Sequence, residues 1–151
     1  MIDLPSPVLI GVIHLPALPG SVCHRLLMDE ILGCALADAK ALRQAGFDAA
    51  IIENFGDIPF TASSLPPSST AAMAVVADRV RREVGIPIGI NALRNDAQAG
   101  LGIAAAVGAS FIRVNVHTGV YATDQGLIEG RAEETLRYRK QIGSRIAVLA
   151  D

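Results

Sequence analysis

Short apolar runs and helix-like segments alternate strictly along this chain of 151 residues. A glycine closes each helix-like segment just before the next apolar run, at Gly46, Gly85, Gly108 and Gly143. Short joints of this kind are typical of parallel βα units, in which each helix crosses back over the sheet. The alternation therefore predicts an α/β protein with one parallel sheet, and it constrains the fold more than any other feature.

The elements themselves follow from residue type and spacing. Apolar runs predict five strands, at residues 8–13, 48–52, 87–90, 110–116 and 145–150. Apolar residues at helical spacing predict four helices, at residues 29–45, 68–84, 95–107 and 130–142. Candidate N-caps are Ser68, Ser69 or Thr70 for the second helix and Asn95 or Asp96 for the third.

Polar side chains collect where the predicted strands end. The connections after the strands are longer than the glycine joints and carry most of the polar residues. Because the carboxyl ends of parallel strands meet at one edge of a sheet, these side chains are expected to converge there, where ligands bind in such folds. The candidates are His14, Glu53, Asn54, Asn91, Arg94, Asn95, Asp96, Asn115, His117 and Asp151.

Side-chain parity indicates how this edge is built. In the fourth strand, Phe111, Arg113 and Asn115 share one face, and the intervening Ile and Val residues share the other. A face with small residues below and polar residues at the strand ends resembles the inside of a closed barrel. The expected fold is therefore of the (β/α)8 TIM-barrel type, represented here by about five strands and four helices.

Five segments together resemble one known family. They are residues 11–20, 53–60, 89–97, 111–115 and 123–130, and they occur in the order found in the BtpA/SgcQ family. The resemblance covers essentially the whole chain, from the first strand to Asp151. It implies a (β/α) barrel. For the name-giving member it also implies a role in photosystem I biogenesis with peripheral association to thylakoid membranes, and another member belongs to a carbohydrate-related gene cluster.

The length of the chain departs from a complete barrel. Eight strands need about 250 residues, whereas this chain of 151 residues has five predicted strands in a single domain, 1–151. We expect it to be the N-terminal part of a longer protein, in preference to a natural half-barrel that self-associates. Strands six to eight, whose loops often bind phosphate, would then lie outside the chain.

Two carboxylates are candidates for catalysis. Glu53 ends a strand between Ile52 and Phe55, where partial desolvation suits a general acid or base. A loop cap or a salt bridge would also explain it. Asp151 follows the fifth strand in the equivalent position. Glu53 or Asp151 is predicted to move protons.

Arg113 has two interpretations. Its guanidinium can bind a substrate carboxylate or phosphate as a fork, or it can pair with Glu53 or Asp151 across the barrel mouth.

The remaining candidates are predicted to bind substrate. Asn54, Asn91 and Asn115 end three successive strands, and buried amides need partners that the hydroxyls of a sugar, a nucleoside or a similar polyol would supply. His14 and Asp124 complete the set. Asp124 belongs either to a turn with Gly126 at positive φ or to a lid over the pocket. For Asn95 and Asp96, helix capping is the competing explanation.

Composition and motifs disfavour several other classes of function. The net charge of −2 and the lack of basic blocks disfavour nucleic acid, and no run approaches the length of a membrane span. Cys23 and Cys34 have no metal-ligand spacing, and glycine fingerprints for nucleotides are absent, so neither a metal nor a cofactor is expected. A cytoplasmic protein is expected, with peripheral thylakoid contact in a photosynthetic source. The two hypotheses are an accessory factor for photosystem I and a barrel enzyme for a small polyhydroxylated or phosphorylated compound.

Overall fold

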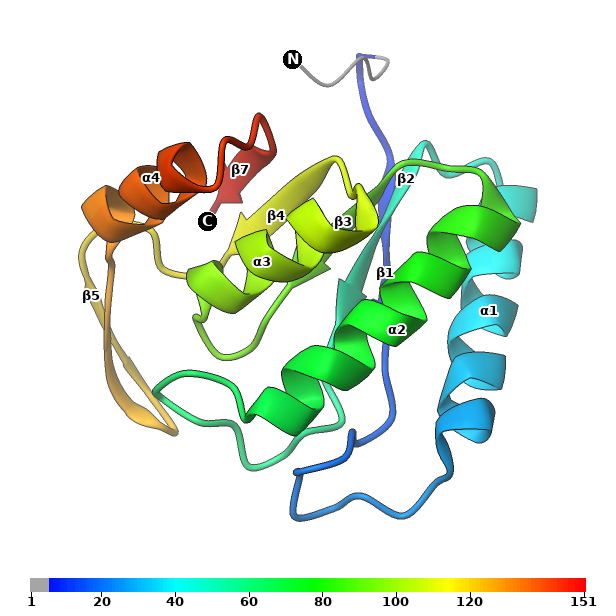
Figure 1. Cartoon of the computed structure of the whole chain (residues 1–151), viewed down its shortest axis with the longest axis horizontal. Coiled ribbons are helices and arrows are strands. Elements are labelled where there is room, and N and C mark those ends of the chain that lie inside the picture. The colour runs from blue at the N-terminus through cyan, green and yellow to red at the C-terminus, as the bar shows by residue number, and fades with distance from the viewer. Residues whose placement is uncertain (1–5) are drawn as a thin grey trace.

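A parallel sheet of five strands lies at the centre of the protein, whose computed structural model describes residues 6–151. The strand order is β1-β2-β3-β4-β7. These strands are β1 (Ile10–His14), β2 (Ala49–Glu53), β3 (Ile88–Asn91), β4 (Phe111–Val114) and β7 (Ala147–Ala150). Four helices connect them: α1 (Met28–Gln44), α2 (Pro67–Val84), α3 (Ala97–Val107) and α4 (Ala132–Gln141) (Figure 1).

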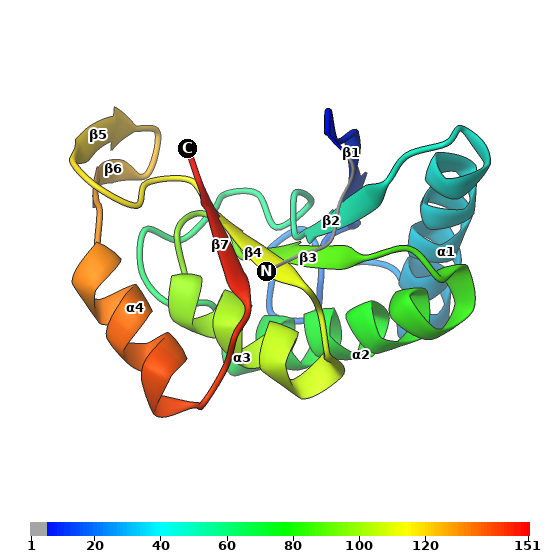
Figure 2. The same cartoon turned by 90° about the horizontal axis from the view of Figure 1, so that it is seen from above.

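The helices all cover one face of the sheet. Figure 2 shows them as an arc along the outer side of the strands, while the opposite face carries no helix of the described residues. Each strand pairs in parallel with the next one in the order, so β1 and β7 form the two open edges. This curved arrangement, with helices on one face, is that of a partial (β/α) barrel and confirms the predicted fold class. The five strands of the parallel sheet and the four helices that connect them were also predicted.

The glycine joints are confirmed by backbone geometry. Gly46, Gly85, Gly108 and Gly143 all have positive φ, between 64° and 83°, which a residue with a Cβ adopts only at a cost. The chain can therefore turn from each helix into the next strand within a few residues.

Two predicted boundaries were wrong. Pro66 is the N-cap residue of α2 and Pro67 begins the helix, so none of the residues 68–70 caps it. Proline suits this place because its φ is already helical and its missing N–H would have no partner in the first turn. Strand β4 ends at Val114 and not at Val116.

The connection after β4 contains a hairpin that was expected to be an irregular loop. Strands β5 (Val120–Thr123) and β6 (Gly126–Glu129) pair antiparallel. The turn between them is closed by Thr123, whose hydroxyl donates to the carbonyl of Gly126 at 2.9 Å. Gly126 has φ of 99°, as the turn interpretation predicted. The segment lacks the alternation of apolar and polar residues that would have indicated a strand pair.

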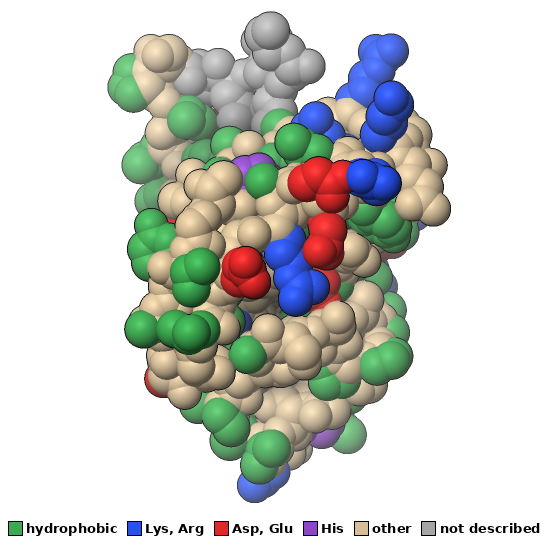
Figure 3. Space-filling model, turned by 90° about the vertical axis from the view of Figure 1, so that its left-hand side faces the viewer, with side chains coloured by type: hydrophobic (Ala, Val, Ile, Leu, Met, Phe, Trp, Pro, Cys, Tyr) green, Lys and Arg blue, Asp and Glu red, His purple; other side chains and the backbone are tan. Residues whose placement is uncertain are grey.

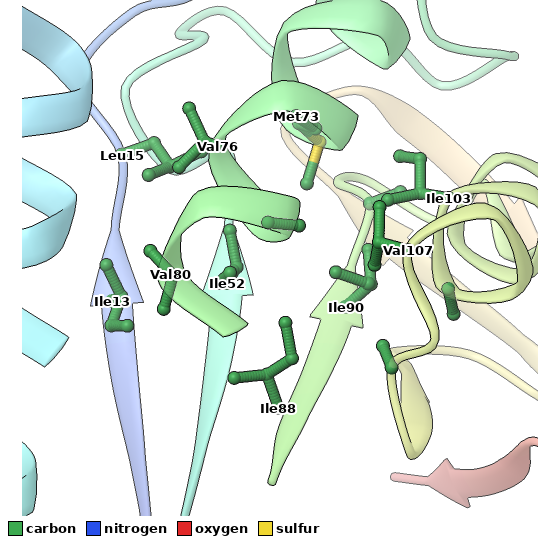
Figure 4. Packing of buried hydrophobic residues seen from close by; sticks show 14 of the residues in the cluster. Ile13, Leu15, Ile52, Met73, Val76, Val80, Ile88, Ile90, Ile103 and Val107 are labelled. Carbon is green, nitrogen blue, oxygen red and sulfur yellow. The ribbon is translucent and has the colours of Figure 1, made fainter. Parts of the chain in front are cut away.

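The main core lies between the sheet and the helices. In Figure 4, Ile52 and Ile90 of the sheet and Met73 and Val76 of α2 meet in one layer. All four side chains are fully buried. The core fixes the helices against the outer face and leaves the inner face to a different set of side chains.

A second, smaller cluster covers the lower part of the inner face. It consists of Ala49, Ile51 and Phe111, with Ile10 and Ala147 packed against it. The ring of Phe111 lies where a Cβ on Gly89 would be, so the glycine leaves room for the only large ring in the cluster. This packing forms an apolar layer on the inner face, next to the polar strand ends.

Replacing Gly89 with Ala should destabilise the protein by about 1 to 3 kcal/mol, because a methyl group there overlaps the fully buried ring of Phe111. Urea unfolding of the purified protein measures the loss. As a matched control, Gly33→Ala in α1 meets no atom within 4 Å and should add about 0.5 to 1 kcal/mol through helix propensity. Adding Phe111→Leu to Gly89→Ala should recover part of the loss. An unchanged urea midpoint for Gly89→Ala would contradict this packing.

Candidate functional site

Five polar side chains meet at the carboxyl ends of the parallel strands. They are His14, Glu53, Asn91, Arg113 and Asp151, here called the mouth cluster. The strand register sets them side by side, because His14 pairs with Glu53 and Glu53 pairs with Asn91. Arg113 pairs with Leu149 of β7, two residues before Asp151. All five were predicted to converge at this edge, and strand parity predicted that Arg113 shares the inner face with Phe111.

Glu53 is the centre of the mouth cluster. The residue is only 4% exposed. Its Oε2 atom accepts hydrogen bonds from the Asn91 side-chain amide and from Arg113 Nη1, the latter at 3.3 Å. Its Oε1 atom lies 3.4 Å from His14 Nε2. Three strands other than its own, β1, β3 and β4, therefore supply partners to one carboxylate.

Arg113 bridges two carboxylates. Besides Glu53, its guanidinium bonds both oxygens of Asp151, with Nε 3.3 Å from Oδ1 and Nη2 on Oδ2. The hydrogen bonds that Arg113 donates to Asp151 raise the pKa of Arg113 above its usual value, and the charges of Asp151 and Glu53 act in the same direction against the cost of burial. Of the two interpretations of Arg113, the structure shows the ion pair, and it shows it with both predicted partners.

Asn91 contributes an atom that lacks a partner. The residue is 1% exposed, and its amide nitrogen donates a hydrogen bond to Glu53. Within residues 6–151, its Oδ1 atom is buried without a hydrogen bond. Buried amide oxygens are nearly always paired in folded proteins. The atom therefore points to a donor that comes from outside the described residues.

Asn115 lies one residue beyond the end of β4 and is partly buried. Within the described chain, its Oδ1 atom and the Nδ1 atom of the nearby His117 are also buried without partners. Its role in binding substrate stays a prediction.

Asn54 has found its partners within the protein. Its Oδ1 accepts from the backbone N–H of Leu93 at 2.7 Å, and its Nδ2 donates to Asp57 at 3.0 Å. Asp57 in turn accepts from the backbone of Leu18 at 2.7 Å. Asn54 thus joins the loops that follow β1, β2 and β3. The amide of Asn54 therefore has partners without a ligand, and a direct contact with substrate stays a prediction.

Asp124 sits in the hairpin turn and not in the mouth cluster. Its carboxylate is 71% exposed and lies 3.4 Å from Arg94 Nη2. Gln125 accepts a hydrogen bond from Arg94 Nε at 3.0 Å, and Arg94 itself stacks over Phe60. The tip of the hairpin is therefore tied to the loop after β3, and substrate binding by Asp124 stays a prediction.

The loop residues Asn95 and Asp96 are structural. Asp96 Oδ1 accepts from the backbone of Ala99 at 2.9 Å and caps α3, as one of the two alternatives predicted. Its Oδ2 accepts from the backbone of Leu65 at 2.8 Å. Asn95 holds both backbone groups of Val116, each at 2.9 Å.

Phe55 is a site residue that the sequence candidates missed. Its ring stacks on His14, with centroids 4.4 Å apart and planes inclined by 23°. Phe55 is nevertheless 45% exposed. It follows Glu53 by two residues, so strand parity continued by two positions could have placed it on the same side. The ring gives the mouth cluster an apolar flank.

Two hollows lie outside the mouth cluster. One of about 420 Å³ is lined by the N-terminal turns of α3 and α4 and by β6, and one of about 200 Å³ lies beside Asn54 and Phe60. Figure 3 faces the side of α4 and the hairpin, where acidic and basic side chains lie close together. On this part of the chain, Arg137 of α4 pairs with Glu133, and Arg131 pairs with Glu134. These charges satisfy one another at the surface.

Within residues 6–151, no group of three or more His, Cys, Asp or Glu side chains could hold a metal ion. In the same part of the chain, no helix is both long and apolar enough to span a membrane.

The partly buried ion pair should make Glu53 and Arg113 energetically dependent on each other. The sum of the losses in unfolding free energy caused by Glu53→Gln alone and by Arg113→Met alone should exceed the loss in the double variant. The difference, which is the coupling energy, should be about 0.5 to 3 kcal/mol. Each single change leaves a charge or a donor unpaired, whereas the double change removes both charges. Urea unfolding of the four proteins gives the coupling. The exposed pair Arg79–Glu83 in α2, at 2.7 Å, is the matched control and should couple by only about 0.3 to 0.5 kcal/mol. Additive effects at Glu53 and Arg113 would count against the bridge.

Known proteins are similar to this chain over most of its length. A sequence model of the BtpA family matches residues 6–151. An uncharacterized protein of Pyrococcus abyssi is 53% identical over 149 residues, which cover 99% of this chain and 57% of the relative. The photosystem I biogenesis protein BtpA of Synechocystis is 50% identical, over 94% of this chain and 50% of the relative. The putative sgc region protein SgcQ of Escherichia coli is 36% identical, over 89% and 50%.

Among solved structures, a mandelate racemase/muconate lactonizing enzyme-like protein from Rubrobacter xylanophilus matches 95% of this chain and 50% of its own, with a TM-score of 0.41 and 10% identity. The chain spans about half the length of the curated relatives it matches. The family model and these identities confirm the resemblance seen in the five sequence segments. The chain belongs to the BtpA family.

Proposed function

We propose that the full-length protein is a (β/α)-barrel enzyme that binds a small polyhydroxylated compound at the mouth cluster. The observation that carries this proposal is the buried carboxylate of Glu53, held by side chains from three other strands at the carboxyl end of a parallel sheet. This is the edge at which barrels of this type place their ligands. A buried charge with so many partners costs free energy that packing alone would not require, which supports a functional role.

The unpaired Asn91 oxygen indicates the chemistry of the ligand. A buried amide oxygen needs a donor, and the hydroxyl of a sugar or polyol is a donor of the right size. The flank formed by Phe55 would suit the apolar face of a sugar ring. Together these groups support a ligand that carries hydroxyls and an apolar face.

Charge in the mouth cluster favours a neutral ligand. Glu53 and Asp151 contribute two negative charges and Arg113 one positive charge, which leaves −1 with His14 neutral. The guanidinium that would have bound phosphate already serves both carboxylates. A phosphate on the substrate would therefore need basic or backbone donors from the rest of the full-length protein, such as the loops after later strands.

A thermal-shift screen of sugars, sugar phosphates, polyols and nucleosides on the full-length protein tests the proposal. A compound that binds the native state raises the unfolding midpoint, and at 100 times its Kd it adds about 2.7 kcal/mol. The shift should be lost in Asn91→Ala, which removes the unpaired oxygen, and kept in Asp38→Ala on the exposed side of α1. Absence of a shift with every compound would sink the enzyme proposal.

A second candidate function is support of photosystem I, acting through a surface of the barrel. The observation in its favour is the name of the Synechocystis relative, which is 50% identical over 142 residues. Such a role would need the fold and the outer surface but not the chemistry of Glu53. The two candidates therefore differ in what they demand of the mouth cluster.

Complementation separates them. Full-length protein expressed in Synechocystis that lacks its own relative should restore photosystem I content if it shares that relative's role. Content is measured from the light-induced absorbance change of the reaction centre. Under the surface hypothesis Glu53→Gln restores it as well as the unaltered protein does, whereas under the enzyme hypothesis Glu53→Gln restores much less. Failure of the unaltered protein to restore any photosystem I would contradict the second candidate.

A further inference from the structure

His14 occupies a different position in the mouth cluster from the other charged or titratable groups. Its Nε2 atom faces Glu53 Oε1 at 3.4 Å, yet 53% of its side chain is exposed. Its ring plane is set by the stack on Phe55. The imidazole thus contacts Glu53 and Phe55, while more than half of its side chain stays exposed.

Glu53 is poorly placed to touch a ligand. Its Oε2 atom is taken by Asn91 and Arg113, and its Oε1 atom faces His14. Only 6% of the side chain is exposed. The donors fix the direction of the carboxylate, and that direction is toward the imidazole.

We propose that His14 is the catalytic group that moves a proton and that Glu53 is the positioning residue that orients it. The proposal rests on the enzyme function proposed above and assigns the proton transfer within it. It changes the roles expected from the sequence, where Glu53 was a proton carrier and His14 a substrate-binding group.

The chemistry follows from the tautomer that Glu53 imposes. A carboxylate facing Nε2 favours the neutral imidazole with its proton on Nε2, which leaves the lone pair on Nδ1. Nδ1 can then accept the proton of a substrate hydroxyl, while the electrons of the O–H bond stay on the substrate oxygen. The imidazolium that forms lies beside the negative charge of Glu53, and it returns the proton to the product. This is the division of labour of a carboxylate–histidine pair.

A purely structural role would predict something different. If His14 only packs against Phe55, its tautomer does not depend on Glu53. His24 provides a structural histidine for comparison in the same protein. Its Nδ1 atom lies 3.0 Å from the carbonyl oxygen of Ala17 and must carry the proton to donate there. His14 and His24 are therefore expected to show opposite tautomers.

Two-bond ¹H–¹⁵N spectra of the full-length protein test the orientation without any ligand. Signals are assigned by their loss in His14→Asn and in His24→Asn. The expected result is the Nε2–H pattern for His14 and the Nδ1–H pattern for His24. In Glu53→Gln, the Gln oxygen is required by the donors Asn91 and Arg113, so its NH₂ group faces His14 and should switch it to the Nδ1–H pattern. An Nδ1–H pattern in the unaltered protein, or no change in Glu53→Gln, overturns the proposal.

Turnover tests the catalytic part, using whichever compound of the sugar and polyol screen shifts the unfolding midpoint. His14→Asn should still bind that compound but lose at least about 100-fold in kcat, as expected for removal of a general base. His14→Phe keeps a ring on Phe55 and serves where the Asn variant folds poorly. Retained turnover in both variants, or a larger loss in Glu53→Gln than in His14→Asn, overturns the assignment. A screen without any hit defeats the proposed function and, with it, the catalytic role of His14, whereas the tautomer result still decides whether Glu53 orients His14.

Discussion

In-register pairing of parallel strands is the constraint on which the whole arrangement depends. It sets His14 beside Glu53 and Glu53 beside Asn91, so residues far apart in the chain become neighbours at one edge. A shift of one residue in any strand would turn its polar end toward the helices and its apolar residues toward the mouth. The apolar layer on each face prevents such a shift, with the main core on the outer face and Phe111 with its neighbours on the inner face.

The buried carboxylate of Glu53 is tolerable only because of that pairing. An ionised group away from water needs partners with good geometry, and removal of one partner is costly. Here the partners come from β1, β3 and β4, and Arg113 passes the interaction on to Asp151 after β7. The strand ends thus form a network that crosses the inner face from one open edge of the sheet to the other. In the same network, His14 and the Oδ1 atom of Asn91 keep hydrogen-bonding capacity that the other members do not use.

Relatives from different organisms share this framework at similar levels of identity. The Pyrococcus abyssi protein is 53% identical and the Synechocystis protein 50% identical, although only the latter has a named role. The chain spans about half the length of these relatives. In the enzyme proposed above, the rest of the full-length protein would supply the other side of the mouth. A ligand enclosed by both sides would meet the charged network described here and the loops of later strands.

The sequence by itself determined the fold class, the number of strands and helices in the parallel sheet, and the inner face, because these depend on local periodicity and on glycines with positive φ. It also indicated both partners of Arg113. Only the tertiary structure decided that Asn54 joins loops, that Asp124 lies on a hairpin, and that Phe55 stacks on His14. These outcomes depend on the direction of single side chains and on contacts between segments about 40 residues apart, such as Asn54 with Leu93. The local sequence pattern carries no information about such contacts, whereas packing around the folded sheet restricts each of these side chains to one direction.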